Sequence, residues 1–234
     1  MRKIKVLIAC EESQTVCKAF RARGYEAYSC DIQKCSGGHP EWHIQQDVMP
    51  LLNGRCSFRT CDGADHMIDG RWDLIIAHPP CTYITAAGAC RMYPQKGEID
   101  TERLIKAIDA TSFFYRILLC DCEKICIENP RPLKIVGLIK ESQRIQPYMW
   151  RDYADENFTK LTYLWLKGVK PLVPTYTDKN DETMPYVNAG CKRADGTYRK
   201  KQGVSFSAKN RSKTFEGVAN AMAKQWGDYV ANLK

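Results

Sequence analysis

The stretch Trp72-Asp73-Leu74-Ile75-Ile76-Ala77-His78-Pro79-Pro80-Cys81-Thr82-Tyr83 decides the fold. An apolar run of this length, preceded by the turn at Asp69-Gly70, predicts a buried strand. Two prolines then end the strand, because proline cannot continue a central sheet. Cys81 therefore follows the carboxyl end of a strand, at the rim where open α/β sheets bind their ligands.

A second stretch has the same form. Ile125-Cys126-Ile127-Glu128-Asn129-Pro130 is a short apolar strand that ends in polar residues and a proline. A lone cysteine beside prolines is more often inert packing than a nucleophile. A thiol and a carboxylic acid at the ends of two such strands favour one shared site, with Cys81 as the nucleophile and Glu128 as the acid.

These two stretches resemble a known family. Pro79-Pro80-Cys81 is similar to the nucleophile motif of DNA cytosine-C5 methyltransferases, and Glu128-Asn129 to their Glu-Asn motif. The resemblance covers residues 4–227 and is greatest to the short phage-encoded members. It implies an α/β, Rossmann-like class I methyltransferase fold: a mostly parallel sheet with helices on both faces, without a large separate target-recognition domain. It also implies S-adenosylmethionine as cofactor and DNA as partner, with a methyl group transferred to carbon 5 of cytosine through a covalent Cys81 intermediate.

Length and composition agree with one domain. We expect residues 1–234 to form a single methyltransferase-like domain, because this length supports one sizeable core. No run approaches the roughly 20 apolar residues that span a bilayer. The first residues read as a strand and lack a signal-peptide cleavage pattern. With twelve cysteines scattered through strands and helices, we expect free thiols and a cytoplasmic location, that of the host if the protein is phage-encoded.

The net charge of +8 is concentrated near the C-terminus. Residues 186–213, within a loop-rich segment at about 171–213, hold eight Lys and Arg and one acid, interleaved with aromatic residues. A solvated basic loop would have this composition, but contact with a phosphate backbone is favoured. The expected nucleic-acid-binding residues are Lys192, Arg193, Arg199, Lys200, Lys201, Lys209 and Arg211.

The N-terminal part predicts a nucleotide site. A strand at 4–10 is followed by a helix that Ser13 caps and Gly24 ends, and then by a strand at 26–30. Asp31 follows the second strand, about 20 residues after the first turn, where an acid can bind both ribose hydroxyls.

The first turn, Cys10-Glu11-Glu12-Ser13-Gln14, has no glycine. A dinucleotide pyrophosphate needs glycines and tolerates no adjacent acids there, so a cationic ligand without phosphate fits better. Acids in this turn are placed to hold the ammonium of S-adenosylmethionine. The loop at 35–44 is expected to close over the cofactor. Cys30, Cys35, His39 and His43 lack the spacing of a common zinc finger, and Cys30 lies inside a strand, so we expect no metal.

The resemblance assigns further cofactor contacts. Gln46-Asp47-Val48 resembles the turn whose acid meets the adenine amino group, and Ile32 and Val48, each following its acid, are placed to sandwich the adenine ring. Val218-Ala219-Asn220-Ala221 resembles the last motif of the family, near the methionine part of the cofactor. The expected cofactor-binding residues are Cys10, Glu11, Asp31, Ile32, Asp47, Val48, Pro79 and Asn220.

Two further residues complete the expected catalytic set of Cys81, Glu128, Lys160 and Thr162. Lys160-Leu161-Thr162 alternates polar and apolar, so Lys160 and Thr162 share one face. This tripeptide stands where the resembled family has an Arg-x-Arg pair whose first arginine contacts the target base. Lys160 is the candidate for that contact, and a plain surface lysine is the alternative.

The rest of the pattern predicts a hairpin at 54–71, a loop at 85–97, helices at 100–119, 133–142 and 215–230, and strands at 145–150 and 159–167. Only about 40 residues separate Trp165 from Phe206, where the family has its target-recognition domain. Modification of RNA or a free nucleotide, a modified sulfonium donor, or a non-catalytic nucleic-acid-binding relative therefore stay open as alternatives.

Overall fold

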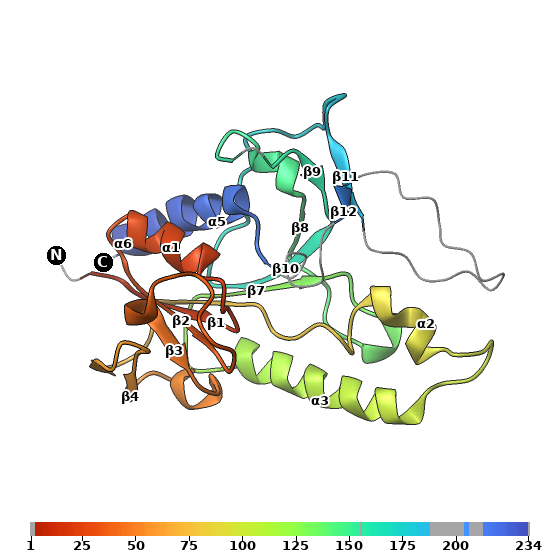
Figure 1. The fold of residues 1–234 in the computed structure, drawn as a ribbon, viewed down its shortest axis with the longest axis horizontal. Helices are drawn as coiled ribbons and strands as arrows, with labels where there is room; N and C mark the ends of the chain where they lie inside the picture. The colour runs from red at the N-terminus through yellow and green to blue at the C-terminus, as the bar shows by residue number, and fades with distance from the viewer. Residues whose placement is uncertain (1–2, 155, 188–203, 206–212, 234) are drawn as a thin grey trace.

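The computed structural model describes residues 3–154, 156–187, 204–205 and 213–233. Its centre is a seven-stranded sheet in the order β3-β2-β1-β6-β7-β10-β8 (Figure 1). The strands are β1 (Lys5–Ala9), β2 (Glu26–Asp31), β3 (His43–Gln45), β6 (Leu74–Ala77), β7 (Ile125–Pro130), β8 (Gln143–Ile145) and β10 (Thr162–Lys167).

All neighbouring strands from β3 to β7 pair in parallel. Strand β10 is antiparallel to both of its neighbours, β7 and β8, so it alone runs in the opposite direction. The predicted mostly parallel α/β sheet is confirmed. The central strands β1 and β6 are apolar from Val6 to Ala9 and from Leu74 to Ala77, because both faces of the sheet are covered.

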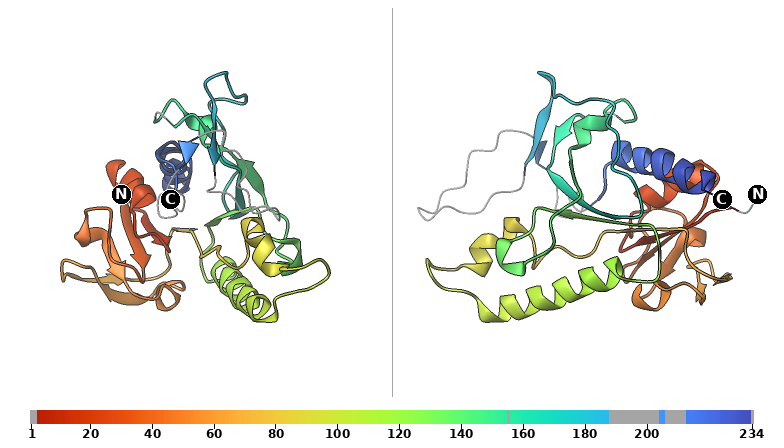
Figure 2. Two further views of the ribbon diagram at one scale, coloured as in Figure 1. Left: turned by 45° about the vertical axis from the view of Figure 1, so that its right-hand side comes forward. Right: turned by 180° about the vertical axis from the view of Figure 1, so that it is seen from behind.

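Strand β1 shows how the two faces are divided. Val6 and Ile8 belong to the core under α1 (Thr15–Ala22) and α5 (Glu216–Met222). Leu7 and Ala9 belong to the opposite core, under α3 (Thr101–Leu118). Successive side chains of a strand point to opposite faces, so one apolar strand supplies both cores. Figures 1 and 2 show α1 and α5 on one side of the sheet and α3 on the other.

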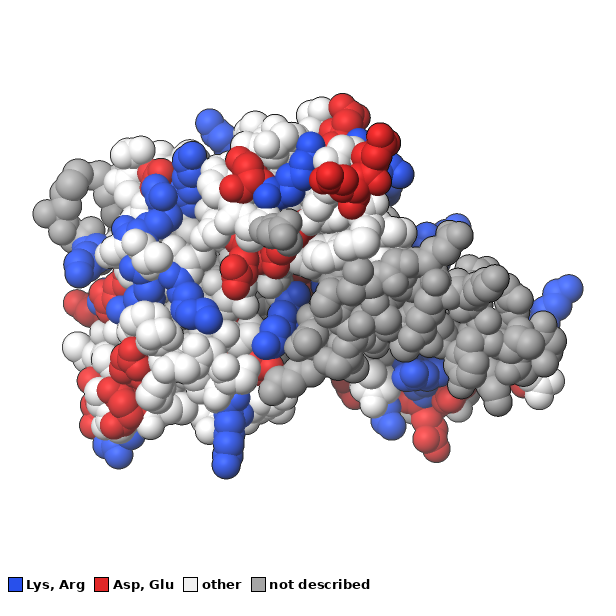
Figure 3. All heavy atoms as spheres, turned by 45° about the horizontal axis from the view of Figure 1, so that its top comes forward, with Lys and Arg blue, Asp and Glu red and all other residues white. Residues whose placement is uncertain are grey.

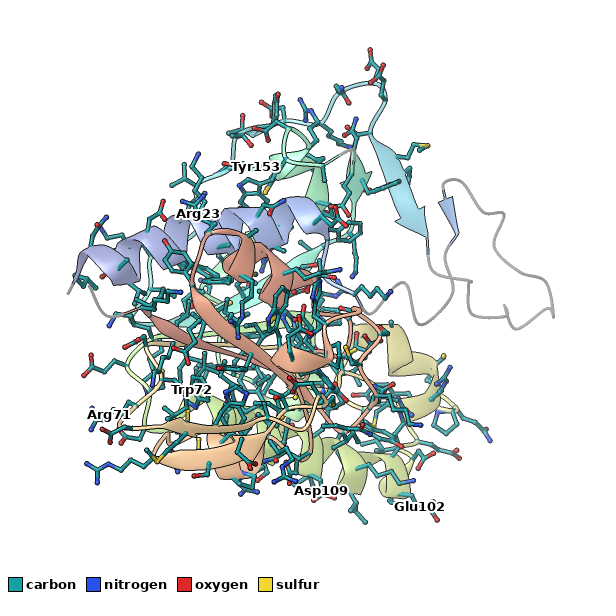
Figure 4. The ribbon with its side chains drawn as sticks, turned by 60° about the vertical axis from the view of Figure 1, so that its left-hand side comes forward. Arg23, Arg71, Trp72, Glu102, Asp109 and Tyr153 are labelled. Carbon is teal, nitrogen blue, oxygen red and sulfur yellow. The ribbon has the colours of Figure 1, made fainter. Side chains whose placement is uncertain are left out.

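The last helix confirms the prediction for 215–230. Helix α5 continues through a π-helical turn, Ala223–Gly227, into α6 (Asp228–Asn232). A Cβ atom on Gly227 would lie 2.4 Å from the Tyr25 ring, so this close contact requires glycine. Asp228 then accepts hydrogen bonds from the Tyr25 hydroxyl at 2.6 Å and from Arg23, labelled in Figure 4, at 2.7 Å.

The predicted helix at 100–119 and hairpin at 54–71 are also confirmed. Asp100 caps α3 by accepting a hydrogen bond from the backbone N–H of Arg103 at 2.8 Å. Glu102 and Asp109 lie on the side of α3 that faces away from the sheet (Figure 4). The hairpin consists of β4 (Cys56–Arg59) and β5 (Asp65–Ile68).

Two predicted elements are wrong. The helix at 133–142 is only a 3-10 turn, Lys134–Val136, because Gly137 has a φ of 63° and turns the chain out of the helix. The strand expected at 145–150 is instead a 3-10 turn, Pro147–Trp150, which begins at a proline. The strand of this region, β8, lies just before that proline.

The expected loops also contain short elements. The 35–44 segment includes the 3-10 turn Pro40–Trp42 and the start of β3. The 85–97 segment includes the 3-10 turn Ala86–Gly88 and α2 (Ala89–Met92). Leu51 lies in one further 3-10 turn, Met49–Leu51.

A second, three-stranded sheet stands apart from the central one. It consists of β9 (Phe158–Thr159), β11 (Met184–Val187) and β12 (Val204–Ser205), in the order β12-β11-β9. The face shown in Figure 3 carries Lys and Arg interspersed with Asp and Glu. Within the described residues, no helix has the length and apolar character needed to cross a membrane.

Candidate active site at the carboxyl ends of the strands

Five parallel strands bring the candidate residues to one edge of the sheet. In spatial order, strands β3, β2, β1 and β6 end at or shortly before Asp47, Asp31, Cys10 and His78, and Glu128 lies among the last three residues of the next strand, β7. Neighbouring parallel strands place their carboxyl ends at the same edge. The expected cofactor residues therefore lie next to the expected catalytic residues.

The turn after β1 adopts a glycine-like backbone without glycine. Cys10 has a φ of 60° and Gln14 a φ of 59°, in the left-handed region that side chains disfavour. Such conformations persist where the surrounding structure enforces them, and they gather at ligand sites. The buried Gln14 amide holds the turn in place: its Oε1 accepts a hydrogen bond from the His39 N–H at 3.0 Å, and its Nε2 donates one to the His39 carbonyl at 2.8 Å.

Glu11 caps α1 from outside the helix. Its carboxylate accepts hydrogen bonds from the backbone N–H groups of Val16 at 2.7 Å and Cys17 at 3.2 Å. The prediction of Ser13 as the cap is wrong, because the Glu11 carboxylate occupies these amides and the Ser13 hydroxyl pairs with that of Thr15 at 3.3 Å. A helix N-terminus binds anions, and here the protein supplies its own. A pyrophosphate cannot use this position.

Burial raises the pKa of Glu11, while His78 and the two backbone hydrogen bonds oppose that rise. With an exposed fraction of 5%, Glu11 is enclosed by protein. The Glu11 carboxylate would therefore have to bind an ammonium ligand while it also accepts the two hydrogen bonds from α1.

Asp31 and Asp47 each use one carboxylate oxygen to accept a backbone hydrogen bond. Asp31 Oδ1 accepts the Gln33 N–H at 2.8 Å, and Asp47 Oδ1 accepts the Met49 N–H at 3.0 Å. Within the described part of the chain, Oδ2 of each carboxylate has no hydrogen bond. Burial raises the pKa of Cys10, and the charges of Asp31 and Asp47 raise it further, so the two acids lie near the Cys10 thiol.

Ile32 is an apolar side chain at the surface, 75% exposed directly after Asp31. Val48, its expected partner around the adenine ring, is 4% exposed and packs in the core. The structure therefore provides one exposed apolar wall of the expected adenine site, with a carboxylate oxygen beside it.

The segment after β2 is docked on the first turn. Ser36 donates hydrogen bonds to Glu12, from its N–H to the carbonyl at 2.9 Å and from its hydroxyl to Oε2 at 2.7 Å. A Cβ atom on Gly37 would lie 2.5 Å from Gln14 Cβ, so only glycine fits. The described residues contain no group of three or more Cys, His, Asp or Glu placed to hold a metal ion.

Cys81 is half-buried on a braced turn. Its carbonyl accepts hydrogen bonds from the N–H groups of Ile84 at 3.1 Å and Thr85 at 2.9 Å. Ile84 in turn packs with Met92 and Ala107 in a small separate core, against which Cys81 also lies. Burial raises the pKa of the Cys81 thiol, and the positive charge of Lys160 opposes this.

Helix α3 holds the same turn through Arg103, which the sequence analysis missed. Its guanidinium donates a hydrogen bond to the Thr82 carbonyl and lies 5.1 Å from the centre of the Tyr83 ring. A Cβ atom on Gly88 would lie 2.7 Å from Arg103 Nη2, so the backbone there leaves room for the guanidinium.

Glu128 lies in a polar cluster with two further residues that the sequence analysis did not identify. Its Oε2 accepts a hydrogen bond from the Thr214 hydroxyl at 2.9 Å and lies 3.1 Å from His78 Nδ1. The side chains of His78 and Glu128 are only 12% and 13% exposed. The one available signal was the position of His78, directly before Pro79.

Charge holds the two partners together. Burial raises the pKa of Glu128, but the hydrogen bond and charge of His78, the charge of Lys160 and the Thr214 hydrogen bond together outweigh it, so the pKa is lowered. Burial lowers the pKa of His78, but the hydrogen bond and charge of Glu128, together with the charge of Glu11, outweigh it, so that pKa is raised. The two shifts have one cause, because each charged form, the Glu128 carboxylate and the His78 imidazolium, stabilises the other.

The strand end carrying Cys81 is tied to the one carrying Glu128. The Asn129 side chain donates a hydrogen bond to the carbonyl of Pro79 at 3.3 Å. The charge of Glu128 raises the pKa of Cys81, while that of Lys160 lowers the pKa of both groups. Lys160 therefore faces the site, and its ammonium lies 5.1 Å from the centre of the Phe215 ring.

The remaining expected residues are placed as follows. Thr162 is buried and donates a hydrogen bond to the Lys160 carbonyl at 3.2 Å, so it braces the lysine's backbone. Pro79 is buried at the end of β6, and Asn220 is half-buried on α5, the helix that packs against α1. The expected nucleic-acid-binding residues lie outside the described residues: Lys192, Arg193, Arg199, Lys200, Lys201, Lys209 and Arg211.

Comparison with models of known protein families found no match to this chain, and comparison with curated proteins found none either.

Proposed function

We propose that the protein transfers a methyl group from S-adenosylmethionine to carbon 5 of cytosine in DNA, through a covalent bond between Cys81 and carbon 6. The observation that carries the proposal is the meeting of Cys81 and Glu128 at the ends of adjacent parallel strands, with the Lys160 charge acting on both. The resemblance assigned these two residues to one mechanism.

The topology supports the proposal. Class I methyltransferases have a parallel sheet with one antiparallel strand inserted next to the edge strand. Here β10 is the one reversed strand, between β7 and the edge strand β8. A sheet of this kind is also found in other α/β proteins, so the site and not the fold decides the function.

The cofactor site fits a nucleoside without phosphates. Asp31 offers Oδ2 for a ribose hydroxyl, and Ile32 offers apolar surface for the adenine ring. Asp47 offers Oδ2 to the adenine amino group. The capped helix α1 leaves no anion position, which suits a donor carrying an ammonium and a sulfonium. S-adenosylmethionine, when bound, would supply the methyl group.

The chain's own residues would activate the base. Carbon 5 of cytosine is a poor nucleophile until a thiolate adds to carbon 6, which makes the ring an enamine. Cys81 forms this bond, and proton donation at ring nitrogen 3 compensates the developing negative charge. After methyl transfer, a water molecule takes the proton from carbon 5, and the electron pair of that C–H bond re-forms the C5–C6 double bond as the thiolate leaves. Glu128 faces nitrogen 3, and Lys160 favours the thiolate over the thiol.

The proposal is tested without knowing the recognition sequence. A pool of random duplexes is made with 5-fluorodeoxycytidine in place of deoxycytidine and incubated with protein and S-adenosylmethionine. Fluorine blocks the elimination, so wild-type protein should remain covalently attached to DNA on a denaturing gel. Cys81→Ser should form no adduct, because serine is a far weaker nucleophile near neutral pH. Cys61→Ser, a change of an exposed thiol on the hairpin loop, is the matched control and should keep the adduct.

Mass spectrometry of DNA from expressing cells gives the second measurement. An increase of one methyl group on cytosine is expected. Unmodified cytosine together with wild-type adduct levels in Cys81→Ser would refute the proposed mechanism.

A further inference from the structure

The His78–Glu128–Thr214 cluster has a geometry that packing alone does not explain. Two side chains from distant parts of the chain, His78 and Thr214, converge on one carboxylate oxygen, Glu128 Oε2. His78 commits Nδ1 to that oxygen, while its Nε2 is buried without a hydrogen-bond partner among the described residues. Buried polar nitrogens are usually satisfied, and an exception calls for a reason. An apolar residue would fill the same space without this cost.

We propose that His78 is a positioning residue that acts through Glu128: the buried His78–Glu128 pair, rather than Glu128 alone, is the acid that serves ring nitrogen 3 of the target cytosine. This inference rests on the proposed function and names a residue that the sequence motifs did not assign. Thr214 fixes the orientation of the carboxylate by donating its hydroxyl proton to Oε2. Oε1 then has no hydrogen bond within the described part of the chain and is available to the base.

The proton balance of the step is simple. When the Cys81 sulfur forms its bond to carbon 6, the electron pair of the C5–C6 double bond moves into the ring and nitrogen 3 becomes basic. The proton of His78 Nδ1 passes to Glu128, and Glu128 gives a proton to nitrogen 3. The pair changes from imidazolium and carboxylate to neutral imidazole and carboxylate. When a water molecule takes the proton from carbon 5, the C5–C6 double bond re-forms, the thiolate leaves, and the proton on nitrogen 3 returns to the pair.

Charged groups on every neighbouring element determine when His78 holds its proton. Glu128 on β7 and Glu11 in the turn after β1 favour the imidazolium, while Lys160, between β9 and β10, disfavours it. Thr214, before α5, is the neutral member. A raised pKa of His78 is the net result, which is consistent with the pair keeping its proton at neutral pH.

The first test reads the protonation of His78 directly. The protein has four histidines, so the imidazole signals of wild type and His78→Asn identify His78 in an NMR titration. His78 should titrate above its ordinary pKa of 6.5, and Glu128→Gln should lower that value. His39, which contacts Glu41 rather than Glu128, is the internal control, and its imidazole signals should not respond to Glu128→Gln. A His78 that titrates at or below 6.5, or that ignores Glu128→Gln, would overturn the inference.

The second test measures the rate of 5-fluorocytosine adduct formation against pH. His78→Asn keeps an amide N–H close to the Nδ1 position but cannot supply a proton. Its rate near pH 7.5 should fall about 10–100-fold, within the range of general acid catalysis. The pH above which the rate falls should also be lower in His78→Asn, because Glu128 alone loses its proton at a lower pH than the pair does. Thr214→Ser keeps the hydroxyl and should leave that pH unchanged. His78→Gln, with its amide reaching toward the Nε2 position, is measured alongside.

The outcomes separate the two proposals. Adducts that form in both His78 variants with the wild-type pH profile would overturn the role of His78 and leave the proposed function standing. A wild-type protein that forms no adduct at any pH would overturn the proposed function, and the role of His78 in it would fall as well.

Discussion

Replacing Glu11 by alanine should destabilise the protein strongly, because its carboxylate is the buried acceptor for two amides at the start of α1. The N–H groups of Val16 and Cys17 would lose their partner in an environment where Glu11 itself is only 5% exposed. A lost helix cap costs about 0.5–2 kcal/mol. A buried donor left unsatisfied costs about 1–3 kcal/mol. These terms overlap, so we expect a loss of about 2–4 kcal/mol in the free energy of unfolding.

The neighbouring Glu12 provides the matched control. Among the residues that the structure describes, its side chain accepts one hydrogen bond, from the exposed Ser36 hydroxyl, so Glu12→Ala should change stability by about 0.5 kcal/mol or less. Glu11→Gln keeps one carbonyl acceptor and should fall between the two. Urea denaturation followed by circular dichroism measures all three, and equal denaturant slopes establish that only stability changed. A Glu11→Ala loss no larger than that of Glu12→Ala would refute the capping role of Glu11.

Three further predictions concern the ligand, the nucleic acid and pH. Asp31→Ala should weaken S-adenosylmethionine binding by about 1–3 kcal/mol in calorimetry, because a hydrogen bond to a charged group is lost. Asp69→Ala, a change of an exposed carboxylate, is the control and should leave binding unchanged. Absence of binding to the wild-type protein would reject S-adenosylmethionine as the methyl donor. Neutralising Arg199, Lys200 and Lys201 together should flatten the salt dependence of DNA binding by about two to three units of slope, and an unchanged slope would mean that these residues do not contact phosphates. The His78 pKa is raised by folding, so its contribution to stability is present below 6.5 and lost as pH rises through the raised value. The Glu128 pKa is lowered, so its contribution is present above 4.5 and lost as pH falls through the lowered value. The stability difference between wild type and His78→Asn should therefore be largest near pH 5–6 and shrink above the raised pKa of His78, and a difference that is constant with pH would contradict the ion pair.

The buried strands could be predicted because their signal is local. β1, β6 and β7 are covered on both faces, so each contains a run of at least three consecutive apolar residues, and prolines mark the ends of β6 and β7. The helix predicted at 133–142 failed because one glycine, Gly137, outweighed an otherwise helical pattern. The short strand β8 has only three residues and carries almost no pattern of its own.

The site could be predicted only in part because its remaining contacts are not local. Cys81 and Glu128 stand in recognisable motifs at strand ends. Thr214 lies 86 residues after Glu128, and no spacing rule links the two. The cap of α1 was assigned to Ser13 on position alone, whereas the fold brings Glu11 to the same amides. In each case a tertiary contact replaced the local rule.

The spacing between neighbouring strands also fixes the distances along the edge of the sheet where the strands end. Neighbouring strands lie about 4.8 Å apart, so the four intervals from the end of β3 to the end of β7 span about 19 Å. Under the proposed function, a nucleoside donor would lie along the β3–β1 part of this length and an extruded base along the β6–β7 part. The distance between donor and acceptor would then be set by strand pairing, the least deformable feature of the sheet. A catalytic group moved to the next strand would miss its target by about one strand spacing, more than a bond-forming step tolerates.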